Sequence, residues 1–346
     1  MNVEQLIIKA ADLGASDLHL AFGVPPKVRL SGSIQDMPEE APLTDEDCEE
    51  MGRQLLGREM PVCGEEDLSL TVGGHRIRAN LYRQSGHVSL ALRILADTIP
   101  DLDTLGLPPA VQDLPGLRQG IVLVTGETGS GKSTTLAAIL RRINETRSAH
   151  IITLEDPIEY IHPPQKCLIN QREIGRDTAS YADGLRAVLR EDPNVILIGE
   201  MRDLITIETA LTAAETGHLV FATLHTNSAA DSIDRIVDVF PAERQRQIRM
   251  QLSMSLQAVL AQQLLKKQGG GRVAACELMV VSSAIRNLIR EGKTPQIANA
   301  VATSANLGSI TMDNAIIKLY KEKAISAEVA RQAAHDPDYV KKNTLF

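Results

Sequence analysis

The 346-residue sequence contains no tryptophan, five tyrosines and four phenylalanines, and it has no long run of lysine and arginine. Proteins that track along single-stranded nucleic acid usually combine a basic groove with aromatic side chains on which the bases stack. The chain has few of these side chains, and its formal net charge is -8. The composition therefore argues against a helicase or a DNA translocase, and we expect no nucleic-acid partner.

Long apolar runs are also absent. No window of the sequence approaches about eighteen consecutive apolar residues, the length that indicates a membrane-spanning helix. The first residues, Met1 to Leu6, carry no basic segment ahead of an apolar stretch, as a secretory signal would. We therefore expect a cytoplasmic protein without a transmembrane segment.

The four cysteines lie far apart and never form a C-x-x-C pair. Such pairs are typical of zinc sites and of redox motifs. Without them, the sequence suggests neither a zinc site nor a disulfide framework. We interpret the cysteines as small apolar side chains that fill the core: Cys48, Cys63, Cys167 and Cys276.

The most informative stretch is residues 121–136, where an apolar strand runs into three glycines and then into a helix. Because Gly126, Gly129 and Gly131 lack a Cβ atom, successive backbone N–H groups can turn toward an anion at the helix N-terminus. In this pattern the lysine reaches the β- and γ-phosphates, and the next serine hydroxyl binds Mg²⁺. The stretch predicts an ATP site formed by Gly126, Glu127, Thr128, Gly129, Ser130, Gly131, Lys132, Ser133 and Thr134.

The length of the chain and the change in its composition predict two domains, because one core seldom extends beyond about 250–300 residues. Apolar periodicity in residues 1–97 favours an α+β domain. Residues 98–119 are rich in proline and glycine, and they predict a linker that is stiffened by proline and hinged at glycine. The expected elements of the first domain are helices at 2–14 and 44–57 and strands at 17–22, 27–30, 68–72, 77–81 and 87–95.

Strands and helices alternate from residue 120 onward, which predicts an α/β domain with a parallel sheet between helices. Beyond Ser228 we expect mostly helix, interrupted by one strand around residues 272–280. The predicted strands of the sheet are residues 121–124, 150–155, 195–199 and 218–223, and the predicted helices begin near residues 132, 181 and 204.

Acidic residues lie at the ends of two of these strands, where ligands bind in open α/β sheets. Glu155, Asp156 and Glu159 could hold Mg²⁺ through water or orient the attacking water. Glu200 ends the next strand in what looks like a Walker B element. The usual aspartate is replaced by Gly199, so that position cannot bind the metal. We therefore expect Glu200 to orient the water.

Histidines flank the last of these strands. His218 and His225 are seven residues apart, so on an extended element they face opposite ways and have different roles. We expect His225, at the carboxyl end, to lie near the γ-phosphate.

Arginines supply the cations that a transferring phosphoryl group requires. Arg186 and Arg190 share one helical face, with an exposed, solvated stripe as the alternative. Arg78 and Arg93 lie on different strands of the first domain. We interpret them as arginine fingers offered to a neighbouring subunit, and solvated strand faces remain an alternative.

Four motifs occur in order in the sequence: the glycine-rich loop at 126–133, the acidic stretch at 153–159, the degenerate Walker B element at 197–203 and the histidine box at 217–228. With these motifs the chain resembles the secretion ATPases of the type II secretion and type IV pilus systems. Residues 14–20 are similar to the start of that family's PAS-like domain. Residues 284–291 resemble a motif of its pilus-retraction branch, although an ordinary amphipathic helix would look alike.

The resemblance implies a PAS-like N-terminal domain (1–97), a linker (98–119) and a RecA-like ATPase domain with C-terminal helices (120–346). It implies a homohexameric motor that uses ATP and Mg²⁺ to retract type IV pili and that associates with the inner membrane through the pilus platform protein. An accessory retraction ATPase, an assembly or secretion ATPase and a nucleotide-gated interaction protein are the alternatives. The site residues that it implies are Arg78, Arg93, Arg186, Arg190, Arg202, Arg235, Glu159, Glu200 and His225, with Ser133, Glu159 and Glu200 near the metal.

Overall fold

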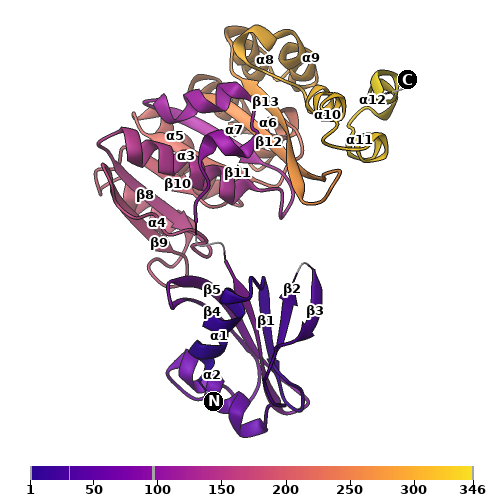
Figure 1. Ribbon diagram of the computed structural model, residues 1–346. Helices are drawn as coiled ribbons and strands as arrows, with labels where there is room; N and C mark the ends of the chain where they lie inside the picture. The colour runs from indigo at the N-terminus through magenta and orange to yellow at the C-terminus, as the bar shows by residue number, and fades with distance from the viewer. Residues whose placement is uncertain (1, 31, 96–97, 345–346) are drawn as a thin grey trace. The chain divides into compact units, whose positions relative to one another are not determined.

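The computed structural model describes residues 2–30, 32–95 and 98–344, and the chain forms two compact units (Figure 1). The first unit comprises Met1–Thr98 and Pro157–Ile161, and the second comprises Ile99–Asp156 and His162–Phe346. The domain boundary predicted at residue 97 lies outside the described residues. No helix in the described ranges is long and apolar enough to cross a membrane.

The first unit contains an antiparallel sheet of six strands in the order β3-β2-β1-β6-β5-β4, accompanied by two helices. Both helices bury their apolar side chains, such as Ile7 and Met51, in one core with the sheet. The elements are α1 (Val3–Asp12), β1 (Asp17–Ala21), β2 (Lys27–Leu30), β3 (Ser33–Asp36), α2 (Asp45–Leu56), β4 (Glu65–Val72), β5 (His75–Gln84) and β6 (His87–Ile94).

Local signals in the sequence explain the helix ends of this unit. The predicted capping box of α2 is confirmed, because the Thr44 hydroxyl accepts from the Asp47 N–H and the Asp47 carboxylate accepts from the Thr44 N–H. The helix stops at Gly57, which has the left-handed φ of 69° that glycine tolerates. Strand β3 was not predicted, because all four of its residues are exposed and carry no apolar alternation.

The second unit contains a sheet of seven strands in the order β13-β12-β7-β11-β10-β8-β9. The strands from β12 to β9 pair in parallel, and β13 pairs antiparallel with β12 at one edge. The elements up to residue 240 are β7 (Gly120–Thr125), α3 (Lys132–Thr146), β8 (His150–Glu155), β9 (Leu168–Glu173), α4 (Tyr181–Val188), β10 (Val195–Ile198), α5 (Leu204–Glu215), β11 (Leu219–Leu224) and α6 (Ala229–Asp238).

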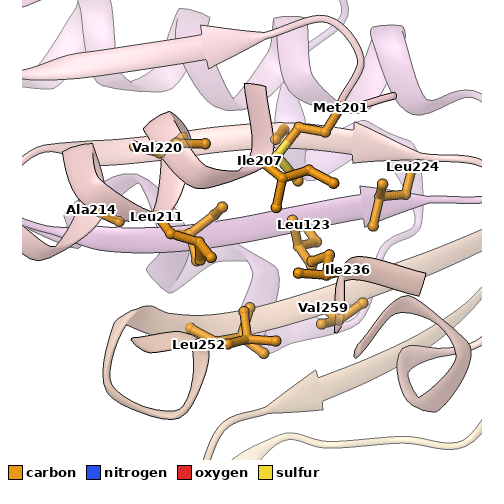
Figure 2. Packing of buried hydrophobic residues seen from close by; sticks show 14 of the residues in the cluster. Leu123, Met201, Ile207, Leu211, Ala214, Val220, Leu224, Ile236, Leu252 and Val259 are labelled. Carbon is orange, nitrogen blue, oxygen red and sulfur yellow. The ribbon is translucent and has the colours of Figure 1, made fainter. Parts of the chain in front are cut away.

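Neighbouring residues of the central strands are buried on both faces of this sheet. On one face, Leu123 and Val220 pack against Leu211 of α5 and Ile236 of α6, as Figure 2 shows. On the other face, the alternate strand residues pack against α3. A parallel sheet covered on both faces explains why β7, β10 and β11 are continuous apolar runs. The α/β fold class is therefore confirmed.

The region beyond α6 differs from the prediction of one strand among helices. Its elements are α7 (Ala242–Ser255), β12 (Leu256–Lys266), β13 (Arg272–Val280), α8 (Ser283–Glu291), α9 (Ile297–Thr303), α10 (Met312–Lys321), α11 (Ala327–Ala333) and α12 (Pro337–Thr344). The helical prediction for β12 was wrong. Its leucines, alanines and glutamines favour helices, but pairing with β7 and β13 overrides that preference.

Residues 99–119 pack as part of the second unit. Leu102, Val111 and Leu114 are buried in the core that includes α3, and Arg142 of α3 lies 2.9 Å from both Asp101 and Asp103. Two 3₁₀ helices, Leu102–Leu105 and Pro109–Gly116, form within this segment. The segment that the sequence predicts as a proline-stiffened, glycine-hinged linker thus contributes leucines and a valine to the core of the second unit.

The cysteines differ in their exposure. Cys48, Cys167 and Cys276 are buried, and burial raises the pKa of the Cys48 thiol to about 11 and that of Cys276 to about 12. Cys63 is exposed, so its interpretation as a core side chain was wrong.

His162 predicts a pH dependence of stability. It is 6% exposed, and burial lowers the pKa of its imidazole from 6.5 to about 4. Below pH 6.5 the imidazole therefore binds a proton in the unfolded chain, whereas in the folded chain it stays unprotonated until the pH falls to about 4. The resulting stability is present above pH 6.5 and is lost as the pH falls toward 4. When the pH falls from 7 to 5, we expect the protonation of His162 to lower the free energy of unfolding by about 2 kcal/mol.

The variant His162→Gln, compared with the original chain by urea unfolding at both pH values, should lack this part of the loss. His335→Gln, at an exposed position, is the matched control and should keep it. An equal loss in the original chain and in His162→Gln would contradict the assignment.

Candidate nucleotide site

The glycine-rich loop joins β7 to α3 in the second unit, as the sequence predicts. Gly126 has a φ of 137°, and a Cβ atom there would lie 2.3 Å from the carbonyl oxygen of Gln262 and 2.6 Å from Ser130 Oγ. No other residue fits this position without moving the backbone of β12. Gly129 and Gly131 also have positive φ values, 81° and 94°. The backbone of the loop therefore has the turn that encloses an anion.

The N-terminus of α3 has no side-chain cap, and Gly131 occupies the cap position. By contrast, the side chains of Ser180, Asp203 and Ser228 cap α4, α5 and α6. The positive end of the α3 dipole thus adjoins the glycine-rich loop without a side-chain oxygen as its cap. Such an end favours a phosphate group.

Polar atoms inside the loop fit a bound polyphosphate. Ser130 Oγ and Thr125 Oγ1 are buried without a hydrogen-bond partner, which is costly unless a ligand or water supplies one. The Lys132 ammonium donates to the carbonyl oxygens of Gly126 at 2.7 Å and Glu127 at 2.9 Å, which holds its charge at the loop. Together these groups can bind negatively charged oxygens.

The residues present also fit Mg²⁺ bound together with phosphates. Among residues 2–30, 32–95 and 98–344, no group of three or more His, Cys, Asp and Glu side chains is arranged to hold a metal ion. Mg²⁺ in ATP sites needs only one or two protein oxygens besides phosphates and waters. The exposed Ser133 hydroxyl, in the first turn of α3, is a donor of this kind.

Glu200 and His225, which follow neighbouring strands, lie together at the carboxyl edge of the sheet. Glu200 Oε1 lies 2.6 Å from Arg202 Nε and 3.3 Å from His225 Nε2. Burial raises the pKa of the Glu200 carboxyl, but Arg202 and His225 outweigh this effect and hold the pKa below its ordinary value. Glu200 is therefore ionised at neutral pH and can accept a hydrogen bond from water. His218 lies at the other end of β11, where its Nδ1 is 2.9 Å from the carbonyl oxygen of Ala213.

The glycine that replaces the Walker B aspartate has a steric reason. A Cβ atom at Gly199 would lie 2.8 Å from Tyr181 Oη and 3.0 Å from the carbonyl oxygen of Leu154. The backbone here is fixed as well, because the Gly199 N–H donates to Leu154 at 2.7 Å and the Thr223 hydroxyl donates to the Gly199 carbonyl. Tyr181 thus packs where an aspartate side chain would begin.

The other predicted carboxylates have different surroundings. Glu155 accepts from the Thr153 hydroxyl at 2.6 Å and from the Gln171 amide at 3.1 Å, so it is bound within the sheet. Asp156 is exposed. Glu159 is also exposed, and it lies in Pro157–Ile161, the segment that clusters with the first unit.

The first-unit arginines lie in one row across the sheet. Arg78 and Arg93 are directly opposite each other on β5 and β6, Arg93 is opposite Asp17 on β1, and Asp17 is opposite Arg29 on β2. Arg93 Nε lies 3.2 Å from Asp17 Oδ1. Like charges facing each other repel, so a row with three arginines and one aspartate favours an anion. The sequence prediction missed Arg29 and Asp17, which only the strand register brings to this row.

The remaining arginines of the prediction are exposed. Arg186 lies 3.7 Å from Asp183 on α4. In the part of the chain that the structure describes, Arg186, Arg190 and Arg235 form no ion pair with Glu200. In the motif at 284–291, Ile285 and Ile289 are buried, and Arg286 donates to the carbonyl oxygens of Ser253 at 2.7 Å and Met254 at 3.0 Å. Arg286 therefore satisfies carbonyl groups at the C-terminus of α7.

The Gly199 geometry predicts the effect of adding one methyl group there. We expect Gly199→Ala to lower the free energy of unfolding by about 1–3 kcal/mol, because the Cβ atom overlaps Tyr181 and Leu154. Adding Tyr181→Phe should recover part of the loss by removing one of the two contacts. Gly116→Ala, where a Cβ atom meets nothing within 4 Å, is the matched control in urea unfolding. Unchanged stability of Gly199→Ala would contradict the steric explanation.

Comparisons with known proteins agree with this geometry. A family model described as "Type II/IV secretion system protein" matches residues 64–331. The chain is 46% identical over 345 residues to the type IV pilus retraction ATPase PilT of Pseudomonas aeruginosa, covering 98% of this chain and 99% of that protein. It is 37% identical over 336 residues to the type IV pilus ATPase PilU of the same species, covering 95% and 88%.

Among solved structures, the chain is similar to the pilus retraction motor PilT with bound ADP, with a TM-score of 0.91, 47% identity and 99% of both chains covered. The family model spans well over half of the sequence, and these relatives span nearly all of it. The chain therefore belongs to the type II/IV secretion system protein family.

Proposed function

We propose that this chain is an ATP-hydrolysing motor that powers type IV pilus retraction. The observation that carries the proposal is the match to PilT, which extends over 98% of the chain at 46% identity and over the whole fold at a TM-score of 0.91. The glycine-rich loop, with its uncapped helix N-terminus and partnerless buried hydroxyls, supports nucleotide binding independently. Identity to the type IV pilus ATPase PilU is lower, at 37%, which favours the role of PilT for this chain.

The proposal includes an assembly and a location. A PAS-like N-terminal domain and a RecA-like domain with C-terminal helices make up each subunit of a homohexamer in the cytoplasm. The hexamer associates peripherally with the inner membrane by docking on the pilus platform protein. This arrangement turns the energy of ATP into movement between domains, which retraction requires.

Roles at the site follow from the surroundings of each side chain. The loop from Gly126 to Thr134 binds the phosphates, with Lys132 at the β- and γ-phosphates. Ser133, Glu159 and Glu200 are the residues that would hold Mg²⁺, and the ion would supply positive charge that neutralises the phosphates. Glu200 accepts a proton from the attacking water, while Arg202 and His225 keep its carboxylate ionised and oriented.

In this proposal the remaining arginines contact the phosphate or lie where neighbouring subunits meet. Arg78 and Arg93 approach the γ-phosphate, and their row of positive charge fits such a role. Arg186, Arg190 and Arg235 are exposed, as residues must be that complete the site at a subunit boundary. An assembly or secretion ATPase would use the same site, so these residues do not set the direction of pilus movement.

Two substitutions test the chemistry. Lys132→Ala and Glu200→Gln should each lower steady-state ATP hydrolysis by about a hundredfold or more, since one removes phosphate binding and the other the proton acceptor. Glu200→Gln should still bind a fluorescent ATP analogue, because it leaves the glycine-rich loop intact. Glu208→Gln, which alters a surface pair with Arg244, is the matched control for loss of a carboxylate.

If Glu200→Gln hydrolyses ATP at a rate within about tenfold of that of the original chain, Glu200 is not the proton acceptor. Absence of hydrolysis in the original chain, with binding preserved, would favour the rival function of a nucleotide-gated interaction protein.

A mixing experiment tests whether Arg78 acts on the neighbouring subunit. Arg78→Ala and Lys132→Ala subunits are each inactive in this account, but a mixed ring contains some interfaces where an intact arginine meets an intact loop. We therefore expect mixing to restore part of the activity. Arg58→Ala, at an exposed arginine paired with Glu66, should remain active alone. Rings shown to mix that stay inactive would contradict action between subunits.

A further inference from the structure

Glu277 is a carboxylate in the interior of the second unit, on edge strand β13. It is 9% exposed, and burial raises the pKa of its carboxyl above the ordinary value. A charge removed from water needs strong partners. Both oxygens have one: Oε1 accepts from the backbone N–H of Ala229 at 2.8 Å, and Oε2 accepts from that of Met312 at 3.4 Å.

These two N–H groups belong to the first residues of two helices, α6 and α10. The cap residues of the helices, Ser228 and Thr311, accept from the third residues, Asp231 and Asn314. The first N–H of each helix is therefore left for another acceptor, and Glu277 accepts from both. Its two carboxyl oxygens therefore lie at two positive helix ends. One carboxylate thus joins the starts of α6 and α10.

The start of α6 is connected to the proposed site. Ala229 follows His225 by four residues, and His225 Nε2 lies 3.3 Å from Glu200 Oε1. Within this short segment, Thr226 Oγ1 lies 2.7 Å from Ser232 Oγ, which in turn donates to the Ser228 carbonyl at 2.7 Å. The segment that follows His225 is therefore held to the first turn of α6.

The start of α10 is connected to the C-terminal helices. Met312 and Ile316 of α10 share a buried core with Ala330 of α11 and Val340 of α12. The Asp313 carboxylate accepts from the N–H groups of His335 at 2.8 Å and Asp336 at 3.0 Å. Helices α10, α11 and α12 lie together near the β13 edge of the sheet (Figure 1). A shift of this group would displace Met312, which binds Glu277.

We propose that Glu277 is a positioning residue for ATP hydrolysis, which holds the start of α6, and so His225 beside Glu200, and joins that start to α10–α12. The inference rests on the proposed ATPase function. It gives the C-terminal helices a direct connection to the site through one side chain. Movement of these helices in the ring would then change hydrolysis without any contact with the nucleotide.

Glu277→Gln is the informative variant, since glutamine keeps the size of the side chain but has only one acceptor oxygen. Its amide nitrogen would face an N–H donor, so one helix start loses its partner. We expect kcat to fall about tenfold while KM for ATP changes less than twofold, because the glycine-rich loop is untouched. Ser309→Ala is the matched control: it removes a buried hydrogen bond to β13, from the Val280 N–H at 3.0 Å, without touching α6. It should keep kcat within twofold.

A double-mutant cycle with His225→Ala separates positioning from general destabilisation. If Glu277 acts through His225, Glu277→Gln should lower kcat about tenfold in the original chain but less than twofold in the His225→Ala chain. Equal effects in both backgrounds would overturn the proposal.

Amide hydrogen exchange tests the connection without using turnover. In Glu277→Gln, exchange should become faster at the helix start whose N–H faces the amide nitrogen, either Ala229 with residues 225–228 or Met312, whereas the strands β7 and β10 should be unchanged. Unchanged exchange at both helix starts would overturn the proposal even if the protein hydrolyses ATP. An original chain that does not hydrolyse ATP would instead contradict the proposed function, and the exchange result would still decide whether Glu277 joins the two helices.

Discussion

The parallel register of β7, β11, β10 and β8 is the constraint on which the site depends. Parallel pairing aligns the carboxyl ends of these strands, so that residues just beyond them meet at one edge of the sheet. Glu200 and His225 come from different loops of the sequence and still lie 3.3 Å apart. Burial of both faces of the sheet prevents the strands from slipping. The geometry of the site is therefore set by the core beneath it.

The position of the charged groups at that edge depends on the backbone of the same strands. Gly199 is held by hydrogen bonds to β8 and β11, and the next residue, Glu200, is thereby presented to Arg202 and His225. A side chain at position 199 would collide with Tyr181. The unusual Walker B element is thus one part of a packed arrangement in which the glycine, the tyrosine and the ionised glutamate depend on one another. Glu277 extends this arrangement to the C-terminal helices.

The sequence predicted most of what local chemistry determines. The glycine-rich loop, the capping box at Thr44 and the central strands carry their own signals, and all of them lie where they were expected. Strand β12 was mistaken for helix, because its residues suit both states and only its neighbours in the sheet decide. The same error hid Gln262, whose carbonyl oxygen leaves room only for glycine at position 126. Residues joined by register or tertiary contact, such as Arg29 and Glu277, have no local signal to find.

Retraction is the central claim of this account, and counting surface pili tests it most directly. The gene would be deleted in its host, and pili on intact cells would be counted with and without a restored copy. The account predicts an excess of unretracted pili on the deleted cells, which a copy of the original gene corrects and a Glu200→Gln copy does not. Cells without pili after the deletion would contradict retraction and assign the chain to pilus assembly.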